Sequence, residues 1–571
     1  MSKQLWQKRT PPEKLREDSS SSIAASIPEK ILEILFLRGL QSEDQLERWL
    51  SPKLQYLSDP SRLKDLDRAV ERFLVAYEKQ EKICVYADFD LDGTSGAALL
   101  FEGLKSLGFT NATSYQPRRL SQGYGVHGDA IREIYGRGAR VLVTVDVGTT
   151  AHEALNIAQE LGMDVIVTDH HLPSEVLPPA YALINPNQKA CASELGHLSG
   201  CGVAFYFLLG LKRAMKQKGW LSTDVDLKVL LDFFVIGTIT DMVPLIKENR
   251  VLVRHGLEQL RHTKRPGLKH LLQRLDLYDR PLLSHDVAMT LAPKLNSLSR
   301  MDMDLLPLEV MLAETDEQAA DMIEVIFKTN DQRRALQVQA ERSALEIVTQ
   351  TPLGEFVWVY SPEFHKGIIG LVATKLAQTF KVPAFVGHVS ESGIIHGSGR
   401  LPEGSVLSLV ELLHQSQDVL EKYGGHAQAA GFSVKADQGE TFRERLLAAT
   451  QKEACEEKKE MVSLYDIDCD LDEITPEFMK WYRHLEPFGS HFPAPTIRFS
   501  QAAVKQAKIL KGGHLKLKLA GAKRELDAIF FRCGDLEIPD KAKVDVLGQI
   551  QWNHYNGQTT PQLLIHQLRL S

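Results

Sequence analysis

Four apolar runs in the first half of the chain are each followed by acidic or histidine residues. The runs and the carboxylates after them are Ile83–Ala87 before Asp88, Val141–Val145 before Asp146, residues 165–168 before Asp169, and residues 233–239 before Asp241. Continuous apolar runs with amphipathic segments between them predict the strands of a parallel sheet that is covered on both faces. The carboxyl ends of such strands meet along one edge of the sheet, where ligands bind. We therefore expect these side chains to converge although they are distant in the sequence.

A cluster of this kind predicts a bound metal. Carboxylates in contact repel one another strongly at an effective dielectric constant of about 20, and a divalent cation offsets that repulsion. With the imidazoles of His170 and His171, the carboxylates suit Mn²⁺ or Mg²⁺ better than a soft metal. Two such ions, roughly 3.5–4 Å apart, can supply a hydroxide and neutralise a phosphate. Each motif alone has a plainer interpretation, such as a helix cap. A calcium loop is excluded because no bidentate glutamate follows residues 88–93 at the required spacing.

Length and composition bound the class of protein. The 571 residues exceed what one hydrophobic core can hold, so two to four domains are expected. Apolar residues make up 43% and charged residues 25% of the chain, which is typical of globular proteins. No run approaches the roughly 18 apolar residues of a membrane helix, and residues 1–16 contain no apolar signal segment. We expect a cytoplasmic protein that has no membrane partner.

Cysteine spacing and net charge exclude further classes. The six cysteines are scattered without a C-x-x-C pair, so neither a disulfide framework nor a structural zinc site is expected. Buried free thiols are the expectation. The net charge of −7 argues against a protein that coats nucleic acid through bulk charge, but it permits a local basic groove.

Periodicity predicts the remaining organisation. Residues 28–50 have helical apolar spacing, and residues 315–349 contain neither glycine nor proline, as a long connecting helix would. A second αβ region follows, with strands at 356–360 and 382–386 and glycine-rich loops. Short strands at 496–499, 514–519, 527–531, 543–547 and 563–565 then predict a small β-barrel. The expected domains are an N-terminal helical segment at 1–65, the first αβ domain at 66–260, a helical connector at 261–350, the second αβ domain at 351–457 and the barrel at 458–571.

The acidic motifs resemble those of the DHH phosphoesterases. They are Asp88-Phe89-Asp90-Leu91-Asp92-Gly93, Val145-Asp146, Asp169-His170-His171 and Gly237-Thr238-Ile239-Thr240-Asp241. Their spacing, with Val243-Pro244-Leu245 after the last motif, is similar to the RecJ branch of single-strand exonucleases. Further matches along nearly the whole chain are Pro117-Arg118-Arg119, Gly123-Tyr124-Gly125, Ile184-Asn185-Pro186-Asn187, Gly200-Cys201-Gly202, Pro293-Lys294-Leu295-Asn296 and His365-Lys366-Gly367. The resemblance implies an α/β multidomain fold: a DHH parallel-sheet domain, a long connecting helix, a DHHA1-type αβ domain and a C-terminal OB-like β-barrel.

The resemblance also implies a metal centre with two ions, Mn²⁺ or Mg²⁺. Their implied ligands are Asp90, Asp92, Asp146, His170 and Asp241, with Asp88 close by. Asp146 would bridge the ions, and His171 would face the scissile phosphate. Asp169 would orient the histidines from behind.

Contacts to a DNA strand are implied as well. The candidates are Arg118, Arg119, Tyr124, Asn296, Arg300, His365, Ser398, Gly399, Arg400, Gly425, His426, Lys516 and Lys518. Glycines would let backbone amides approach a phosphate, and Arg400 could form paired hydrogen bonds with it. His514, Lys516 and Lys518 alternate, so they would share one face of a strand. The plainer alternatives are tight turns for the glycines, surface salt bridges for the arginines and a solvated strand face for the lysines.

Some positions depart from the family pattern. Val147 stands where the family usually has Asn or Cys, and Thr240 stands where it usually has Ala. Asn296-Ser297-Leu298-Ser299-Arg300 lacks the glycine that the family places before the arginine, which bears on how Arg300 is presented. Ser490-His491-Phe492-Pro493 replaces Gly-Asn-Pro after Pro487-Phe488-Gly489, which bears on domain docking.

The expected function is stepwise hydrolysis of single-stranded DNA from the 5′ end to mononucleotides, in DNA repair and recombination. The polarity rests on the resemblance alone. Arg400 and His426 would help to balance charge at the reacting phosphate, and single-strand-binding protein and a helicase would be partners. Two alternatives stay open: a DHH-family phosphodiesterase for short oligonucleotides or cyclic dinucleotides, and a non-catalytic DNA-binding scaffold. The long helix and the extra β-module argue against the first, because short substrates need no extended track, and the intact acidic cluster argues against the second.

Overall fold

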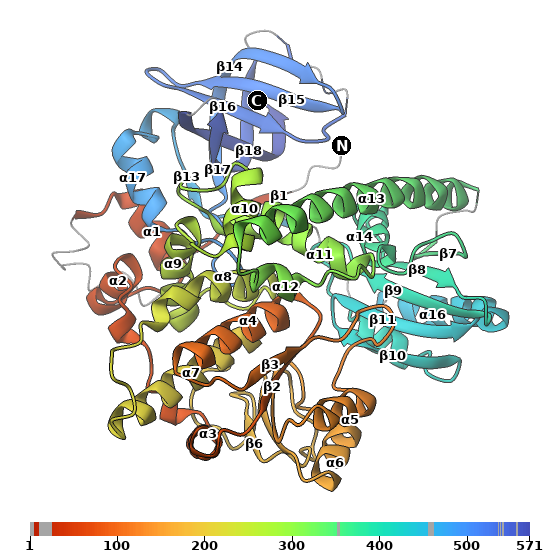
Figure 1. The fold of residues 1–571 in the computed structure, drawn as a ribbon. Coiled ribbons are helices and arrows are strands. Elements are labelled where there is room, and N and C mark those ends of the chain that lie inside the picture. Colours follow the sequence, from red (N-terminus) through yellow and green to blue (C-terminus); the bar gives the residue numbers. More distant parts are fainter. Residues whose placement is uncertain are drawn as a thin grey trace.

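The structure is a computed structural model that describes residues 5–10, 26–350, 354–454, 462–534, 536, 538–539, 542–555 and 558–571. Two αβ bodies and a β-barrel are joined through a layer of helices (Figure 1). Cys455 lies outside the described residues; the other five cysteines are free thiols, of which Cys84, Cys201 and Cys469 are buried. In the described part of the chain, no helix is both long and apolar enough to cross a membrane.

The first αβ body contains the predicted parallel sheet. Its strands are β2 (Ile83–Ala87), β3 (Ala112–Tyr115), β4 (Val141–Val145), β5 (Asp164–Thr168) and β6 (Ala182–Ile184), all parallel in the order β3-β2-β4-β5-β6. One face packs against α3 (Leu66–Lys79), α4 (Leu91–Ser106) and α7 (Gly200–Gln217), and the other against α5 (Gly128–Gly136) and α6 (His152–Glu160). Alternate residues of β2 show the division, since Val85 lies in one core and Tyr86 in the other. The prediction of a sheet covered on both faces is confirmed.

The prediction of a strand over residues 233–239 is wrong. Residues 233–239 lie in a helix, α8 (Leu231–Thr240), and every residue from Leu231 to Ile239 is buried. The helix is enclosed by α4, α7 and α9 (Lys247–Arg261). A helix that is buried all round has no polar face, so its sequence shows the same continuous apolar run as a buried strand. Asp241 therefore stands at the end of a helix.

Helices connect the two αβ bodies. After α9 come α10 (Pro266–Arg274), a π-helical turn (Asp286–Leu291), α11 (Ala292–Arg300), α12 (Pro307–Met311) and α13 (Asp316–Thr349). The predicted long helix is α13, whose 34 residues begin after Thr315. The Thr315 side chain accepts a hydrogen bond from the Gln318 backbone N–H, which caps the helix. The long connecting helix is confirmed.

The second αβ body is a five-stranded sheet in the order β10-β11-β9-β8-β7. Its elements are β7 (Val357–Ser361), α14 (Ile369–Phe380), β8 (Ala384–Val389), β9 (Ile394–Arg400), α15 (Leu409–His414), β10 (Leu420–His426), β11 (Ala429–Lys435) and α16 (Gly439–Ala454). The glycine motifs expected in loops, 397–400 and 424–426, lie in β9 and β10 instead. Glycine suits β9 because a Cβ at Gly397 would lie 2.0 Å from the Phe432 ring of β11.

The C-terminal module is a closed barrel, as predicted. Its strands are β14 (Ile497–Leu510), β15 (His514–Ala520), β16 (Glu525–Phe530), β18 (Gln558–Leu570) and β17 (Lys543–Tyr555), and pairing of β14 with β17 closes the ring. A short strand, β13 (Ile467–Asp468), pairs with β14, and α17 (Pro476–His484) lies between them in sequence.

The N-terminal segment completes this module. Strand β1 (Leu5–Lys8) pairs in parallel with β12 (Val462–Tyr465). Helices α1 (Glu29–Leu37) and α2 (Glu43–Leu50) place Ile34 and Trp49 in the same core as Phe492 of the barrel module. Residues from the two ends of the chain thus bury one hydrophobic surface together.

Candidate metal centre

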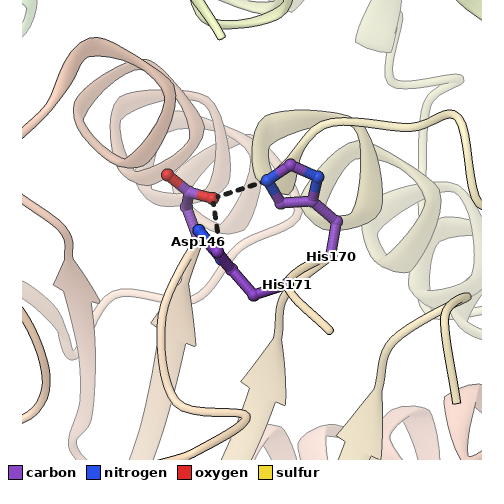
Figure 2. A group of neighbouring side chains, drawn as sticks. All are labelled: Asp146, His170 and His171. Atoms are coloured by element: carbon purple, nitrogen blue, oxygen red, sulfur yellow. Dashed lines mark ion pairs between the residues drawn. The ribbon is translucent and has the colours of Figure 1, made fainter. Parts of the chain in front are cut away.

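The carboxyl edge of the first sheet brings three predicted ligands together. Asp146 follows β4, His170 follows β5, and Asp241 ends α8. Nε2 of His170 lies 3.2 Å from Oδ1 of Asp146 and 3.5 Å from Oδ2 of Asp241. Figure 2 shows Asp146 beside both histidines, with Nδ1 of His171 3.8 Å from the same Oδ1. Residues from three separate elements therefore converge at one point.

All the predicted ligands belong to groups compact enough to hold a cation. In the part of the chain that the structure describes, three groups have ligand atoms within 4.8 Å of one another: Asp146 with His170 and His171, Asp92 with His170 and Asp241, and Asp88 with Asp90 and Asp146. His170 and Asp146 each belong to two of these groups. Such overlapping sets of ligands are what two neighbouring ions need.

Backbone amides orient two of the carboxylates. Asp90 caps α4, where its Oδ1 accepts from the N–H groups of Asp92 (2.9 Å) and Gly93 (3.0 Å). Asp92 lies in the first turn of α4 and accepts from Gly200 N–H (2.6 Å) and Cys201 N–H (3.2 Å) at the start of α7. Both helices direct their positive N-terminal ends at the cluster, which favours negative charge there.

Burial and mutual repulsion disfavour the ionised forms of the clustered carboxylates when no cation is bound. Burial, and then the neighbouring carboxylates, raise the pKa of Asp92 to about 7 and that of Asp241 to about 9. The same causes raise the pKa of Asp146 well above its usual range, and burial lowers the pKa of His170 to about 4.

Buried ligand atoms in the cluster also lack partners. Among the described residues, Asp88 Oδ1, Asp146 Oδ1 and His170 Nε2 have no hydrogen-bond partner. Unpaired buried polar atoms are costly. Carboxylate oxygens and a neutral imidazole nitrogen in this state fit a divalent cation.

Asp169 organises the histidine pair. Its carboxylate accepts from the backbone N–H groups of Thr149 (2.9 Å), His170 (2.7 Å) and His171 (3.1 Å) and from Nδ1 of His171 (2.8 Å). Burial alone would raise the pKa of Asp169, but the bond from His171 holds it below its usual range. Burial would likewise lower the pKa of His171, but the same bond raises it to about 9. The bond to Asp169 therefore favours the protonated form of His171.

Comparison with known proteins identifies the family. The chain matches the DHH family, N-terminal domain, over residues 82–238, the DHHA1 domain over 353–452 and the RecJ OB domain over 465–567. The single-stranded-DNA-specific exonuclease RecJ of Dickeya dadantii is 31% identical over 97% of this chain and 98% of its own length. The chain belongs to the RecJ family. The RecJ of Bacillus subtilis is 32% identical over 95% of this chain and 68% of its own length.

A solved RecJ structure has the same fold. The crystal structure of Thermus thermophilus RecJ in complex with Mn²⁺ superimposes with a TM-score of 0.82 at 26% identity, over 99% of this chain and 79% of the other. The predicted resemblance to RecJ and the predicted order of DHH, DHHA1 and OB domains are confirmed.

In this RecJ-family chain, three of the predicted arginines lie near one another beside the cluster. Arg119 stacks on the Phe89 ring, 4.8 Å from its centroid. Arg300 Nη1 donates to the Gly367 carbonyl (3.2 Å), and Arg400 Nη1 donates to Ser398 Oγ (2.8 Å) and the Gly399 carbonyl (2.7 Å). Burial, followed by the charges of Arg119 and Arg400, lowers the pKa of Arg300 to about 9.

Other predicted contact residues lie around these groups. Tyr124 is 52% exposed, and its hydroxyl lies 3.5 Å from His171 Nε2. His426 ends β10, and its charge contributes to the lowered pKa of His170, after burial and His171.

Further predicted contact residues lie near Arg300 and in β10. His365 Nδ1 accepts from Gly367 N–H (3.1 Å), and Arg300 donates to the carbonyl of the same glycine. Gly425 has a φ of 138°, and a Cβ there would lie 2.5 Å from the Ala429 carbonyl oxygen. Asn296 is half-buried in α11, one turn before Arg300.

Three predicted contacts have protein partners instead. Arg118 donates to the Met303 carbonyl (3.0 Å) and pairs with Asp304 (3.1 Å), so it links the first αβ body to the connector. Lys516 and Lys518 pair with Asp527 (3.6 Å) and Glu525 (3.5 Å) of the next strand. Figure 1 places their strand, β15, far from β2, the strand that leads into Asp88. For Arg118 this is the salt bridge named as the alternative, whereas the lysines, for which a solvated strand face was the alternative, are ion-paired within the barrel.

The sequence analysis assigned no role to three residues that form hydrogen bonds with the backbone of His170 and His171 or with Asp169. Asn185 Nδ2 donates to the His171 carbonyl (2.8 Å), and Asn187 Nδ2 donates to the His170 carbonyl. Thr149 supplies an N–H to Asp169. A signal was present, because Asn185 follows the apolar run of β6 as the acids follow theirs.

Proposed function

We propose that this chain is a metal-dependent exonuclease that hydrolyses single-stranded DNA from the 5′ end to mononucleotides, in DNA repair and recombination. The observation that carries the proposal is the convergence of Asp146, His170 and Asp241, in which Asp146 Oδ1 and His170 Nε2 are buried without a hydrogen-bond partner among the described residues. Family membership supports the substrate, because the RecJ relatives are named as single-stranded-DNA-specific exonucleases. The Mn²⁺ in the T. thermophilus structure supports the metal.

The metal centre would use the overlapping ligand sets. The proposed ligands are Asp88, Asp90, Asp92, Asp146, His170 and Asp241. When bound, two Mn²⁺ or Mg²⁺ ions would supply a nucleophilic hydroxide at neutral pH and balance phosphate charge. Asp146 and His170 would each be available to both ions, since each belongs to two of the groups.

His171 would act on the scissile phosphate. Its imidazolium, fixed by Asp169, can donate a hydrogen bond to a phosphate oxygen and offset the charge that develops there. Its orientation needs no rearrangement during the reaction, because the Nδ1 side is already bonded. Asp169 thus acts by holding His171 and has no contact of its own with the DNA.

The second αβ body would bind the phosphates. Ser398 and the Gly399 carbonyl already fix the Arg400 guanidinium, which leaves its other N–H groups for two phosphate oxygens. Arg300 and Arg119 would extend this positive surface, and His426 would lie at its edge. Tyr124 would contact the terminal nucleotide through its exposed ring.

One assay tests the proposal. A long single strand labelled at the 5′ or the 3′ end is incubated with Mn²⁺, Mg²⁺ or a chelator, and the products are resolved by size. The 5′ label should appear at once as a mononucleotide, and chelation should abolish hydrolysis. Asp146→Ala should lose at least about a thousandfold in rate while still binding the strand in chelator. Near-normal hydrolysis by Asp146→Ala, or preferential cleavage of a dinucleotide, would contradict it.

Partners and compartment are part of the same proposal. The proposed compartment is the cytoplasm. A single-strand exonuclease needs a duplex to be opened and its strands kept apart, so a helicase and single-strand-binding protein are the proposed partners. Adding both to the assay should make a blunt duplex digestible. No gain in digestion would argue against them.

A further inference from the structure

Three helices present a glycine to the acidic cluster. The glycines are Gly93 of α4, Gly200 of α7 and Gly237 of α8. A Cβ added at these positions would lie 2.7 Å from Asp88 Cβ, 2.4 Å from Asp146 Cβ and 2.7 Å from Asp92 Oδ1, respectively. Real Cβ atoms do not approach other atoms this closely. Each glycine therefore lets one helix pack directly against one carboxylate residue.

Gly200 contacts two of these residues at once. Its N–H donates to Asp92 Oδ2 at 2.6 Å, and its Cα faces Asp146, where a Cβ would also lie 2.6 Å from Oδ1 and 2.7 Å from Cα. Asp146 itself adopts a left-handed backbone with φ of 62°, which few non-glycine residues adopt. Gly200 thus contacts both Asp92 and Asp146.

The helix that carries Gly200 cannot easily move away. Helix α7 has 18 residues, packs against α4, α3 and α8, and is capped by Ser199, whose side chain accepts from Gly202 N–H. A methyl group at Gly200 would meet the backbone and Cβ of Asp146, which cannot rotate aside as the end of a long side chain can. Either Asp146 or the Gly200–Asp92 hydrogen bond must be displaced.

We infer that Gly200 is a positioning residue that sets the separation of the Asp92 and Asp146 carboxylates, and with it the affinity of the centre for a divalent cation. The inference rests on the proposed function, because it takes the cluster to be a metal centre. Gly237 has the same role toward Asp92 from α8. Changes to residues that orient metal ligands typically weaken metal affinity 10- to 100-fold.

The test measures Mn²⁺ binding directly. The six-line electron paramagnetic resonance signal of free Mn²⁺ is titrated with the full-length protein, and unfolding in urea is followed in parallel. Gly200→Ala should raise the Mn²⁺ Kd about 10- to 100-fold, while binding of single-stranded DNA in chelator is retained. Gly210→Ala is the matched control, because it adds the same methyl group to the same helix against only the flexible end of Leu66 (2.6 Å). Its Mn²⁺ Kd should equal that of the wild type.

The outcomes separate this inference from the proposed function. If the wild type binds no Mn²⁺, the proposed metal centre fails. If the wild type binds Mn²⁺ and a folded Gly200→Ala binds it equally well, only the role of Gly200 is overturned. If Gly200→Ala does not fold, Gly237→Ala is judged by the same criterion.

Discussion

Both carboxylate oxygens of Asp169 accept hydrogen bonds from the protein, from three backbone N–H groups and from Nδ1 of His171. This distinguishes it from Asp88 and Asp146, each of which has a buried oxygen without a partner among the described residues. Residues of one chemical type in neighbouring motifs thus have different tasks, and the difference lies in their hydrogen bonds. A carboxylate whose oxygens are occupied orients its neighbours, whereas one with a free buried oxygen is suited to a cation.

Asp169→Asn should lower turnover roughly 10- to 100-fold, because the amide cannot hold the His171 imidazolium as a carboxylate does. Single-strand binding in chelator should be unchanged. Steady-state rates on a labelled strand, compared with filter binding, check this. A variant that loses binding and turnover in equal measure would show that Asp169 acts on the fold instead.

Glu248 makes stability depend on pH. It is buried and accepts from Ser58 Oγ (2.7 Å) and His197 Nε2 (2.7 Å). Burial would raise the pKa of Glu248, but the bond from His197 and then that from Ser58 lower it to about 2. Its folded pKa lies below the ordinary value of 4.5, so its contribution is complete above pH 4.5 and is lost as the pH falls toward 2.

Glu248→Gln should therefore cost about 2 kcal/mol of unfolding free energy at pH 7 and progressively less below pH 4.5. Urea unfolding of both proteins from pH 7 to pH 3 measures the difference. A difference that stays constant over this range would contradict the assignment.

Among the elements, α8 shows the limit of local pattern. Its apolar run resembles the runs of β2, β4 and β5 so closely that periodicity predicts a fourth strand. What decides for a helix is that α4, α7 and α9 enclose the segment on all sides. The consequence for the cluster is small, since Asp241 reaches it from the helix end as it would have from a strand end.

Strand β15 shows a second limit of prediction from local sequence. Its alternating residues predict a basic face of the strand, but they do not predict which acidic side chains pair with that face. Leu515, Leu517 and Leu519 are buried, whereas Lys516 and Lys518 face outward and pair with Asp527 and Glu525. An ion pair inside the protein reduces the charge available to a phosphate. We therefore expect Lys516 and Lys518 to contribute less to DNA binding than unpaired lysines would.

Removing both acids should expose that charge. Glu525→Gln with Asp527→Asn should tighten single-strand binding and steepen its dependence on log salt concentration by up to about 1.4, since each added phosphate contact contributes about 0.7. Fluorescence anisotropy in chelator over a series of KCl concentrations measures both. Glu71→Gln with Glu78→Gln on α3 changes the net charge equally at another surface, and a like effect from this pair would indicate bulk charge alone.

In the whole molecule, Arg250 of α9 ties three segments together. Its guanidinium lies 3.7 Å from the Trp49 ring centroid and donates to the carbonyls of His484 (3.1 Å), Glu486 (3.0 Å) and Pro487 (3.3 Å). These carbonyls lie at and just beyond the end of α17, where a helix leaves its last acceptors unpaired. The first αβ body, the N-terminal helices and the barrel module are thereby joined at one buried side chain.

Arg250→Met should keep most of the packing volume but leave these carbonyls without donors. We expect a loss of about 2–4 kcal/mol in unfolding free energy, measured by urea denaturation. Arg342→Met, at an exposed pair with Glu346 on α13, should change it by less than about 0.5 kcal/mol. Equal losses of unfolding free energy in the two variants would contradict the proposed role of Arg250 in joining the three segments.

The sequence by itself determined which residue types stand at the ends of the apolar runs, the long helix, and the closed β-module. These features depend on periodicity and on the order of residues within short segments, which are local properties. The tertiary structure alone decided that α8 is a helix, that the N-terminal segment belongs to the barrel core, and that Lys516 and Lys518 are ion-paired. It also decided that Gly200 separates two carboxylates more than fifty residues apart in the sequence. The lysine pairs depend on the register between two neighbouring strands. The others depend on partners distant along the chain, and a local pattern carries no information about such partners.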